Sequence, residues 1–272
     1  MAFFKDLGRG FSSHADALVF LFRHNLWFYF IYPVLIAIAI FFLGVLSYVA
    51  LKDWMMDQVM DWLGLNDLPG AGWWGGWVKD AAGWVFGFTF GLIFFFIYNI
   101  IYKYILLIIL SPVLAYLSER IEEVKSMKTF PFDFGQLLKD ILRGILIALR
   151  NLFIELGVIL LCTLIAWLPG VGWLFGILLA PFLYILASYF LGFSMMDYTC
   201  ERHRMKISQS TRFIRKHKGI AIGNGIVFNL LLLIPFVGIS IGPILSVTAA
   251  TLASLEAMEE DARASAPPAA QP

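Results

Sequence analysis

Two stretches, Leu168-Pro169-Gly170-Val171-Gly172 and Ile234-Pro235-Phe236-Val237-Gly238, interrupt the two longest uncharged runs of this chain. The runs are Leu156–Met196, with 41 residues, and Gly219–Leu255, with 37 residues. Each is far longer than the ~20 apolar residues that cross a bilayer once. Proline removes a backbone donor and clashes with the preceding turn, and glycine adopts φ values that other residues avoid. Each run is therefore predicted to form two helices folded back on each other as a hairpin inside the membrane.

Paired hydrophobic segments broken by Pro and Gly are typical of transport pathways. The candidate path residues at the two bends are Pro169, Gly170, Gly172, Pro235 and Gly238. The bent backbone must be buried in protein or face water, because lipid cannot satisfy its polar groups. The sequence leaves two interpretations open, a bend that lines a pathway and a tight packed turn.

The composition predicts an all-α integral membrane protein. Of the 272 residues, 60% are apolar and only 14% are charged, whereas soluble domains have about 25% charged residues. The net charge of +1 gives no reason to expect a nucleic-acid partner. We find no nucleophile elbow, phosphate-binding loop, dinucleotide fingerprint or paired metal-binding histidines. We therefore expect no enzyme activity, no cofactor and no metal.

The apolar pattern divides the chain into two full membrane spans, about 26–51 and 81–110, and two hairpins, about 152–196 and 219–255. Apolar residues at helical spacing in residues 1–24 predict an amphipathic N-terminal helix. That helix either lies in the membrane interface or packs on the cytoplasmic face of the protein itself. We expect Pro181 to break the helix that follows the first bend.

Charge predicts which loops lie in the cytoplasm, because basic loops stay inside. The acidic loop Lys52–Asp80 is predicted outside. The loop Asp197–Lys218 has seven Lys/Arg against two acids, which fits the inside only if the first hairpin returns to the side it entered. Both hairpins, and both termini, are thus predicted on the cytoplasmic side. Because most hairpin arms fall short of the ~30 Å hydrocarbon core, we expect partial insertion.

Two arginines precede the first bend. Arg143 and Arg150 are seven residues apart and share a helix face. They form either a funnel for an anion or an anchor that reaches lipid phosphates. Asp197, at the end of the first uncharged run, is interpreted as a structural ion pair or cap rather than a proton relay.

A series of short stretches, mostly in the C-terminal half, recurs in a known order: Ser111-Pro112, Ser118-Glu119-Arg120-Ile121-Glu122, Lys139-Asp140 through Arg150 to the first bend, Asp197-Tyr198, Arg212–Lys218, Gly223-Asn224-Gly225, Ile234-Pro235, and Pro243 through Ala249-Ala250-Thr251. In these stretches the chain resembles the CysZ-like sulfate transporter family, which belongs with the etoposide-induced protein 2.4 family. The resemblance covers roughly residues 10–258, so we expect one membrane domain, 1–258, and the composition of the Ala/Pro-rich tail, 259–272, predicts disorder. The resemblance implies two full spans with two partially inserted hairpins, a homo-oligomer in the inner membrane, and sulfate uptake that feeds cysteine synthesis.

One departure from the family concerns the substrate. CysZ proteins carry a Gly-hydrophobic-Arg-Arg stretch before the first span that is implicated in sulfate binding. The matching positions here are Asn25, Leu26, Trp27 and Phe28, so two aromatic residues replace the arginines. The polar residues closest to this position, weak candidates for anion binding, are Arg23, His24 and Asn25.

The sequence therefore supports two hypotheses. In the first, the chain is a channel or permease that passes a small oxyanion, sulfate by resemblance, along the hairpin bends. In the second, it is a membrane-shaping or scaffold protein of the same family without transport, since partially inserted hairpins wedge one leaflet. The missing arginine pair favours the second, and the paired bends favour the first.

Overall fold

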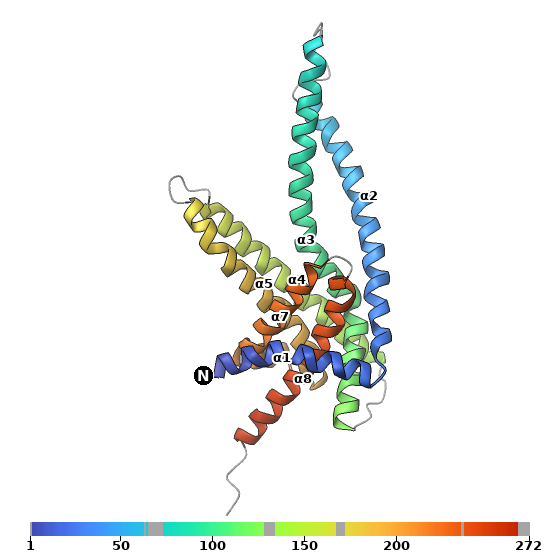
Figure 1. Cartoon of the computed structure of the whole chain (residues 1–272), viewed down its shortest axis with the longest axis vertical. Helices are drawn as coiled ribbons and strands as arrows, with labels where there is room; N and C mark the ends of the chain where they lie inside the picture. Colours follow the sequence, from blue (N-terminus) through green and yellow to red (C-terminus); the bar gives the residue numbers. More distant parts are fainter. Residues whose placement is uncertain are drawn as a thin grey trace, which may run out of the picture. The chain divides into compact units, whose positions relative to one another are not determined.

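The computed structural model describes residues 2–62, 64, 73–127, 134–166, 172–234 and 237–265, and the regular structure in these ranges is helical. The elements are α1 (Ala2–Arg23), η1 (Trp27–Phe30), α2 (Ile31–Trp62), α3 (Trp73–Ser126), α4 (Phe134–Ala166), α5 (Gly172–Arg202), α6 (Ile207–Lys216), α7 (Lys218–Leu232) and α8 (Val237–Ser265). They form two compact units (Figure 1). Unit 1 comprises residues 1–35 and 107–272, and unit 2 comprises residues 36–106.

Unit 2 is a pair of antiparallel helices, the main part of α2 and the first part of α3. The hydroxyl of Tyr98 donates to the carbonyl of Ile40 at 3.2 Å, and the Tyr48 ring lies 5.9 Å from the Phe90 ring. Farther along, the Met60 side chain faces Gly83. Most of the large apolar side chains on both helices are exposed, as expected of helices whose surroundings are lipid.

The core of unit 1 is built from α1, α5, α7 and α8, which pack on one another. α7 lies between α1 and α5 because glycines let the backbones approach. A Cβ at Gly223 would lie 2.6 Å from the carbonyl oxygen of Leu7 in α1, and one at Gly225 would overlap the carbonyl of Ser188 in α5. Gly223 and Gly225 thus permit the close approach of α7 to α1 and α5. Small residues serve this purpose in membrane helices generally.

The arms of each predicted hairpin pack on each other, α4 with α5 and α7 with α8. The arrangement of two full spans with two hairpins stays a prediction. Figure 1 shows α4 and α5 running side by side away from the core of unit 1. Six helical segments of the described chain are long and apolar enough to cross a membrane: Trp27–Trp62, Gly76–Tyr98, Tyr104–Ser126, Ile141–Leu164, Leu179–Arg202 and Ser240–Ser265. α7 is not among them, since its 15 residues measure roughly 22 Å. The prediction that most hairpin arms are too short is wrong, because segments of α4, α5 and α8 are long enough to cross. Partial insertion itself stays a prediction.

The predicted break at Pro181 is wrong, because α5 continues through it from Gly172 to Arg202. α3 likewise contains Pro112 and continues to Ser126. Membrane helices tolerate proline because neighbouring groups satisfy the freed carbonyl. α8 also extends to Ser265, well into the tail that the sequence assigns to disorder from residue 259, while residues 266–272 lie outside the described chain.

α1 forms as predicted and packs across α7 and α8 (Figure 1), which is the second of its two predicted arrangements. Its polar residues Asp6, Ser13 and His14 are buried there. The opposite face of α1 is apolar and exposed, and its large side chains are Phe4, Phe11, Leu18, Val19 and Phe22. This exposed stripe suits the membrane interface, so the two arrangements are compatible.

Candidate functional site

The strongest polar contacts inside unit 1 join α4 to α5 and to the start of α6. The guanidinium of Arg143 donates to both carboxylate oxygens of Asp197, at 3.0 and 2.8 Å. It also donates to the Ser210 hydroxyl at 3.0 Å and to the Met205 carbonyl, and lies 3.8 Å from the Glu201 carboxylate. Arg143 therefore ties three helices together.

This ion pair is nearly dry. The side chains of Asp197 and Glu201 are 5% exposed and that of Arg143 is 14% exposed. A two-point contact between guanidinium and carboxylate is the strongest hydrogen-bonded pair that proteins make. Removal of one partner would leave a buried charge without compensation.

A second arginine lies two helical turns along α4. Arg150 donates to the side-chain oxygen of Asn151 at 3.2 and 3.0 Å, and its guanidinium lies 4.7 Å from the centre of the Phe193 ring. The amide of Asn151 donates to the Ser194 hydroxyl at 3.2 Å. Arg150 is thus held by a neutral amide and an aromatic face.

Together these side chains form a polar seam between α4 and α5, defined here as Arg143, Arg150, Asn151, Ser194, Asp197 and Glu201. On α5, the spacing of Ser194, Asp197 and Glu201 by three and four residues places them on one face. Two carboxylates lie beside Arg143, whereas the partners described above for Arg150 are an amide and an aromatic ring.

Sequence reasoning found both arginines and the ion-pair role of Asp197, but it did not identify Arg143 as the partner of Asp197. It missed Asn151 and Ser194. The sequence features that could have identified these two residues are an amide next to Arg150 and a hydroxyl in an otherwise apolar run. Arg202 instead reaches α3, where it donates to the Ala115 carbonyl at 2.9 Å and lies 3.6 Å from the Glu122 carboxylate.

The candidates before the first span lie at the end of α1, away from the seam's two helices. Arg23, His24 and Asn25 are exposed. Asn25 has a φ of 55°, and the amides of Asn25 and Leu26 bond back to Phe22 and Leu21 at 3.3 and 2.8 Å. This is the hydrogen-bond pattern of a helix end whose cap residue is left-handed, a position that asparagine suits.

Of the candidate bend residues, Pro169, Gly170 and Pro235 lie outside the described chain. Gly172 is the first residue of α5. Gly238 is buried at the start of α8, where a Cβ would overlap the carbonyl of Leu231 at the end of α7. At Gly238 the bend is a tight packed turn.

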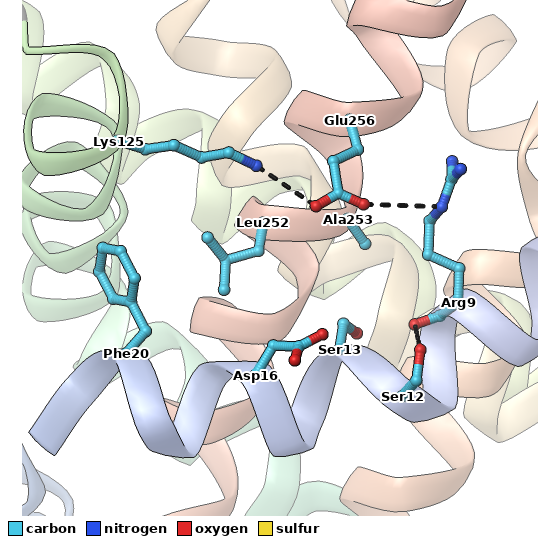
Figure 2. Close-up of a pocket in the computed structure, with 9 residues that line it drawn as sticks. All are labelled: Arg9, Ser12, Ser13, Asp16, Phe20, Lys125, Leu252, Ala253 and Glu256. Atoms are coloured by element: carbon cyan, nitrogen blue, oxygen red, sulfur yellow. Dashed lines mark hydrogen bonds and ion pairs between the residues drawn. The ribbon is translucent and has the colours of Figure 1, made fainter. Parts of the chain in front are cut away.

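A pocket of about 310 Å³ lies among α1, the last part of α3 and α8 (Figure 2). Glu256 lies between two cations there, 3.5 Å from Lys125 and 3.8 Å from Arg9, and Asp16 is on the wall. Two cations and two carboxylates make this pocket electrically balanced, so it offers an anion no net attraction.

The described residues include no group of three or more His, Cys, Asp or Glu that could hold a metal ion. The chain matches a family model described as sulfate transporter CysZ/Etoposide-induced protein 2.4 over residues 13–243. No individually curated protein matches the chain.

Proposed function

Because the chain belongs to the sulfate transporter CysZ/etoposide-induced protein 2.4 family, we propose that this multi-pass membrane protein passes a small oxyanion across the inner membrane. Sulfate, used for sulfur assimilation and cysteine synthesis, is the substrate that the family description favours. The observation that carries the proposal is a family match over most of a chain whose apolar helices enclose a charged seam. Intramembrane charge is costly and is usually kept for function.

In this proposal the path follows the two hairpins, which insert partially and return to the cytoplasm, where both termini lie. The candidate residues have separate roles. Arg150 attracts the anion, whereas Arg143, which is bound by Asp197, fixes the spacing of α4, α5 and α6. In this proposal the bend at residues 169–172 lines the path, whereas the second bend is packed tightly at Gly238.

The test is uptake of radiolabelled sulfate by proteoliposomes that contain the purified full-length protein. We expect Arg150→Gln to lower the initial rate about tenfold and Arg150→Lys to keep part of it, because a charge-assisted contact of about 1.4 kcal/mol corresponds to a factor of ten. Lys139→Gln is the matched control, since it removes a cation from an exposed position on the same helix. Uptake of sulfate and other oxyanions no faster than in empty vesicles would contradict the proposal.

Homo-oligomerisation is a further part of the proposal and rests on the family resemblance. Native mass spectrometry of the protein released from nanodiscs measures the number of copies directly. A protein that is present as a single copy and retains full uptake would contradict homo-oligomerisation, and the transport proposal would be unaffected.

The exposed stripe on α1 favours a second candidate function, shaping of the membrane without transport. A helix with a buried polar face and an exposed face of Phe4, Phe11, Leu18 and Phe22 inserts shallowly and wedges one leaflet. Electron microscopy of vesicles with and without the protein tests it. Curved or tubular vesicles together with no anion uptake would favour this function over the first.

A further inference from the structure

An open pocket of about 500 Å³ lies where α5 ends and α6 passes the end of α8. We call it the α6 pocket. The lining residues used here are His203, Arg204, Gln209, Arg212, Lys216 and Asp261. Three permanent cations face one carboxylate, so the α6 pocket has an excess of positive charge that the pocket in Figure 2 lacks.

One face of α6 supplies three of these six polar groups. Gln209, Arg212 and Lys216 are spaced by three and four residues, which places them in a row along the helix. The side-chain oxygen of Gln209 accepts the backbone N–H of Lys206 at 2.8 Å, so its NH₂ end is the end available to a ligand. Lys216 donates to Asp261 at 2.7 Å, while Arg212 is exposed.

Arg204 comes from the turn between α5 and α6 and has an unusual backbone. Its φ is 52°, and the amides of Arg204 and Met205 bond back to Glu201 and Cys200 at 2.8 and 3.1 Å. The same pattern ends α1, with Asn25 at the left-handed position. Glycine and asparagine suit that position, and arginine does not. A strained residue that carries a charge into a pocket indicates a function for the charge.

The wall of the α6 pocket is also fixed in place. Arg143 donates to the Met205 carbonyl and to the Ser210 hydroxyl, which ties the turn and the first part of α6 to α4. A site whose backbone is already ordered spends less binding free energy on ordering it.

We propose that the α6 pocket binds a dianionic oxyanion group, such as phosphate or sulfate. Guanidinium groups match the oxygen spacing of these groups, and Arg204, Arg212 and the Gln209 amide offer donors from the turn and from one face of α6. The group belongs either to a free anion or to the phosphate monoester of a lipid headgroup. The proposal is independent of transport, because it requires binding alone.

The experiment uses the full-length protein in phosphatidylcholine nanodiscs. Calorimetric titration with inorganic phosphate and with sulfate tests a free anion, and native mass spectrometry with added phosphatidic acid or phosphatidylcholine tests a lipid headgroup. We expect saturable binding in the first arm or selective retention of phosphatidic acid in the second, and either result supports the site. Absence of both overturns it.

The decisive variant is Arg204→Gly. Glycine suits the left-handed backbone, so this change should leave the melting temperature unchanged or raise it while binding weakens about tenfold. Arg212→Gln, on the exposed surface of α6, should weaken binding without unfolding and keeps the test valid if the first variant folds poorly. Arg263→Gln is the control, since Arg263 is 80% exposed on α8 and pairs with Glu259 outside the pocket. Wild-type binding by both pocket variants would overturn the proposal.

Discussion

Among single residues, Arg143 links several parts of unit 1, because it contacts α5, the α5–α6 turn and α6. Its partner Asp197 is buried with it. A buried pair of this kind is costly to break and much less costly to remove completely. The two cases can be separated by experiment.

We expect Asp197→Asn to destabilise the protein by about 3 kcal/mol, because Arg143 then lacks its two-point partner in a nearly dry site. The double variant Arg143→Gln/Asp197→Asn should recover part of that loss. Thermal unfolding in detergent measures both, with Lys139→Gln as the control on the same helix. Strictly additive losses would show that the two side chains do not interact.

His14 gives a pH dependence of known sign. Burial between α1 and α8 lowers the pKa of His14 to about 4 from the ordinary value near 6.5. Its Nδ1–H donates to the Gly10 carbonyl at 3.0 Å and Nε2 faces the Ser246 hydroxyl, an arrangement that suits the neutral ring. The unfolded chain thus takes up a proton at a higher pH than the folded one.

Neutral His14 therefore contributes fully to the free energy of unfolding above pH 6.5. That contribution is lost as the pH falls toward 4, at up to about 1.4 kcal/mol per pH unit. We expect the stability difference between wild type and His14→Gln to shrink over that range. Thermal unfolding from pH 7 to pH 4 measures it, with the exposed His24→Gln as control. A difference that stays constant with pH would contradict the assignment.

The sequence identified candidate residues where a local pattern marks them. It failed to identify contacts that depend on the register between two helices. Arg143 and Arg150 are visible as cations beside an apolar run. The pairing of Arg143 with Asp197, 54 residues later, depends on how α4 and α5 align, which no local pattern records. The left-handed backbone at Arg204 was invisible for another reason, since arginine is not a residue that signals it.

Among the helices, α7 decides how unit 1 packs. It is the shortest arm of the two hairpins, yet it contacts α1, α5 and α8. Gly223 faces α1 and Gly225 faces α5, so a side chain on either position forces two helices apart. Glycine is unfavourable inside a helix unless close packing requires it.

We expect Gly225→Ala to destabilise the protein by about 2 kcal/mol or more, because the added methyl group overlaps the Ser188 carbonyl, which belongs to rigid backbone. Gly157→Ala in α4 is the matched control. Its Cβ meets open space, and alanine is a better helix former by about 1 kcal/mol. Equal melting temperatures for the two variants would show that α5 and α7 do not approach as closely as described.

Hairpin pairing was predictable from the Pro/Gly bends, but the continuity of α5 through Pro181 was not. The rule that proline breaks a helix derives from helices in water, where the freed carbonyl and the lost bond cost about 3 kcal/mol. α5 instead lies in a run of 41 uncharged residues, and in lipid an intact helix is the arrangement that satisfies the remaining backbone.

For the molecule as a whole, ion pairs join the two ends of the described chain. Lys5 and Arg9 of α1 pair with Glu260 of α8, and His217, between α6 and α7, lies between Asp6 and Asp261 at 3.1 and 3.3 Å. α1 and the end of α8 therefore meet on the same side of unit 1, as expected if both termini lie in the cytoplasm.

The two arms of the second hairpin differ in length, and this difference is the basis for predicting how deeply the hairpin enters the membrane. α8 is long enough to cross the membrane, but α7 measures roughly 22 Å against a hydrocarbon core of ~30 Å. If α6 lies on the cytoplasmic side, α7 ends inside the membrane at Leu232, next to Leu233. We expect Leu233→Cys, at a side chain that is 73% exposed, to resist a membrane-impermeant maleimide added from either side.

Two other single-cysteine positions calibrate the measurement. Ser208→Cys on α6 should react from the cytoplasmic side, and Asp57→Cys on α2 should react from the outside, since both positions are exposed. The wild-type protein serves as the blank because Cys162 and Cys200 are buried. Labelling of position 233 from the outside as fast as position 57 would show that the hairpin crosses completely, and the charge of the α6 segment would then need a different explanation.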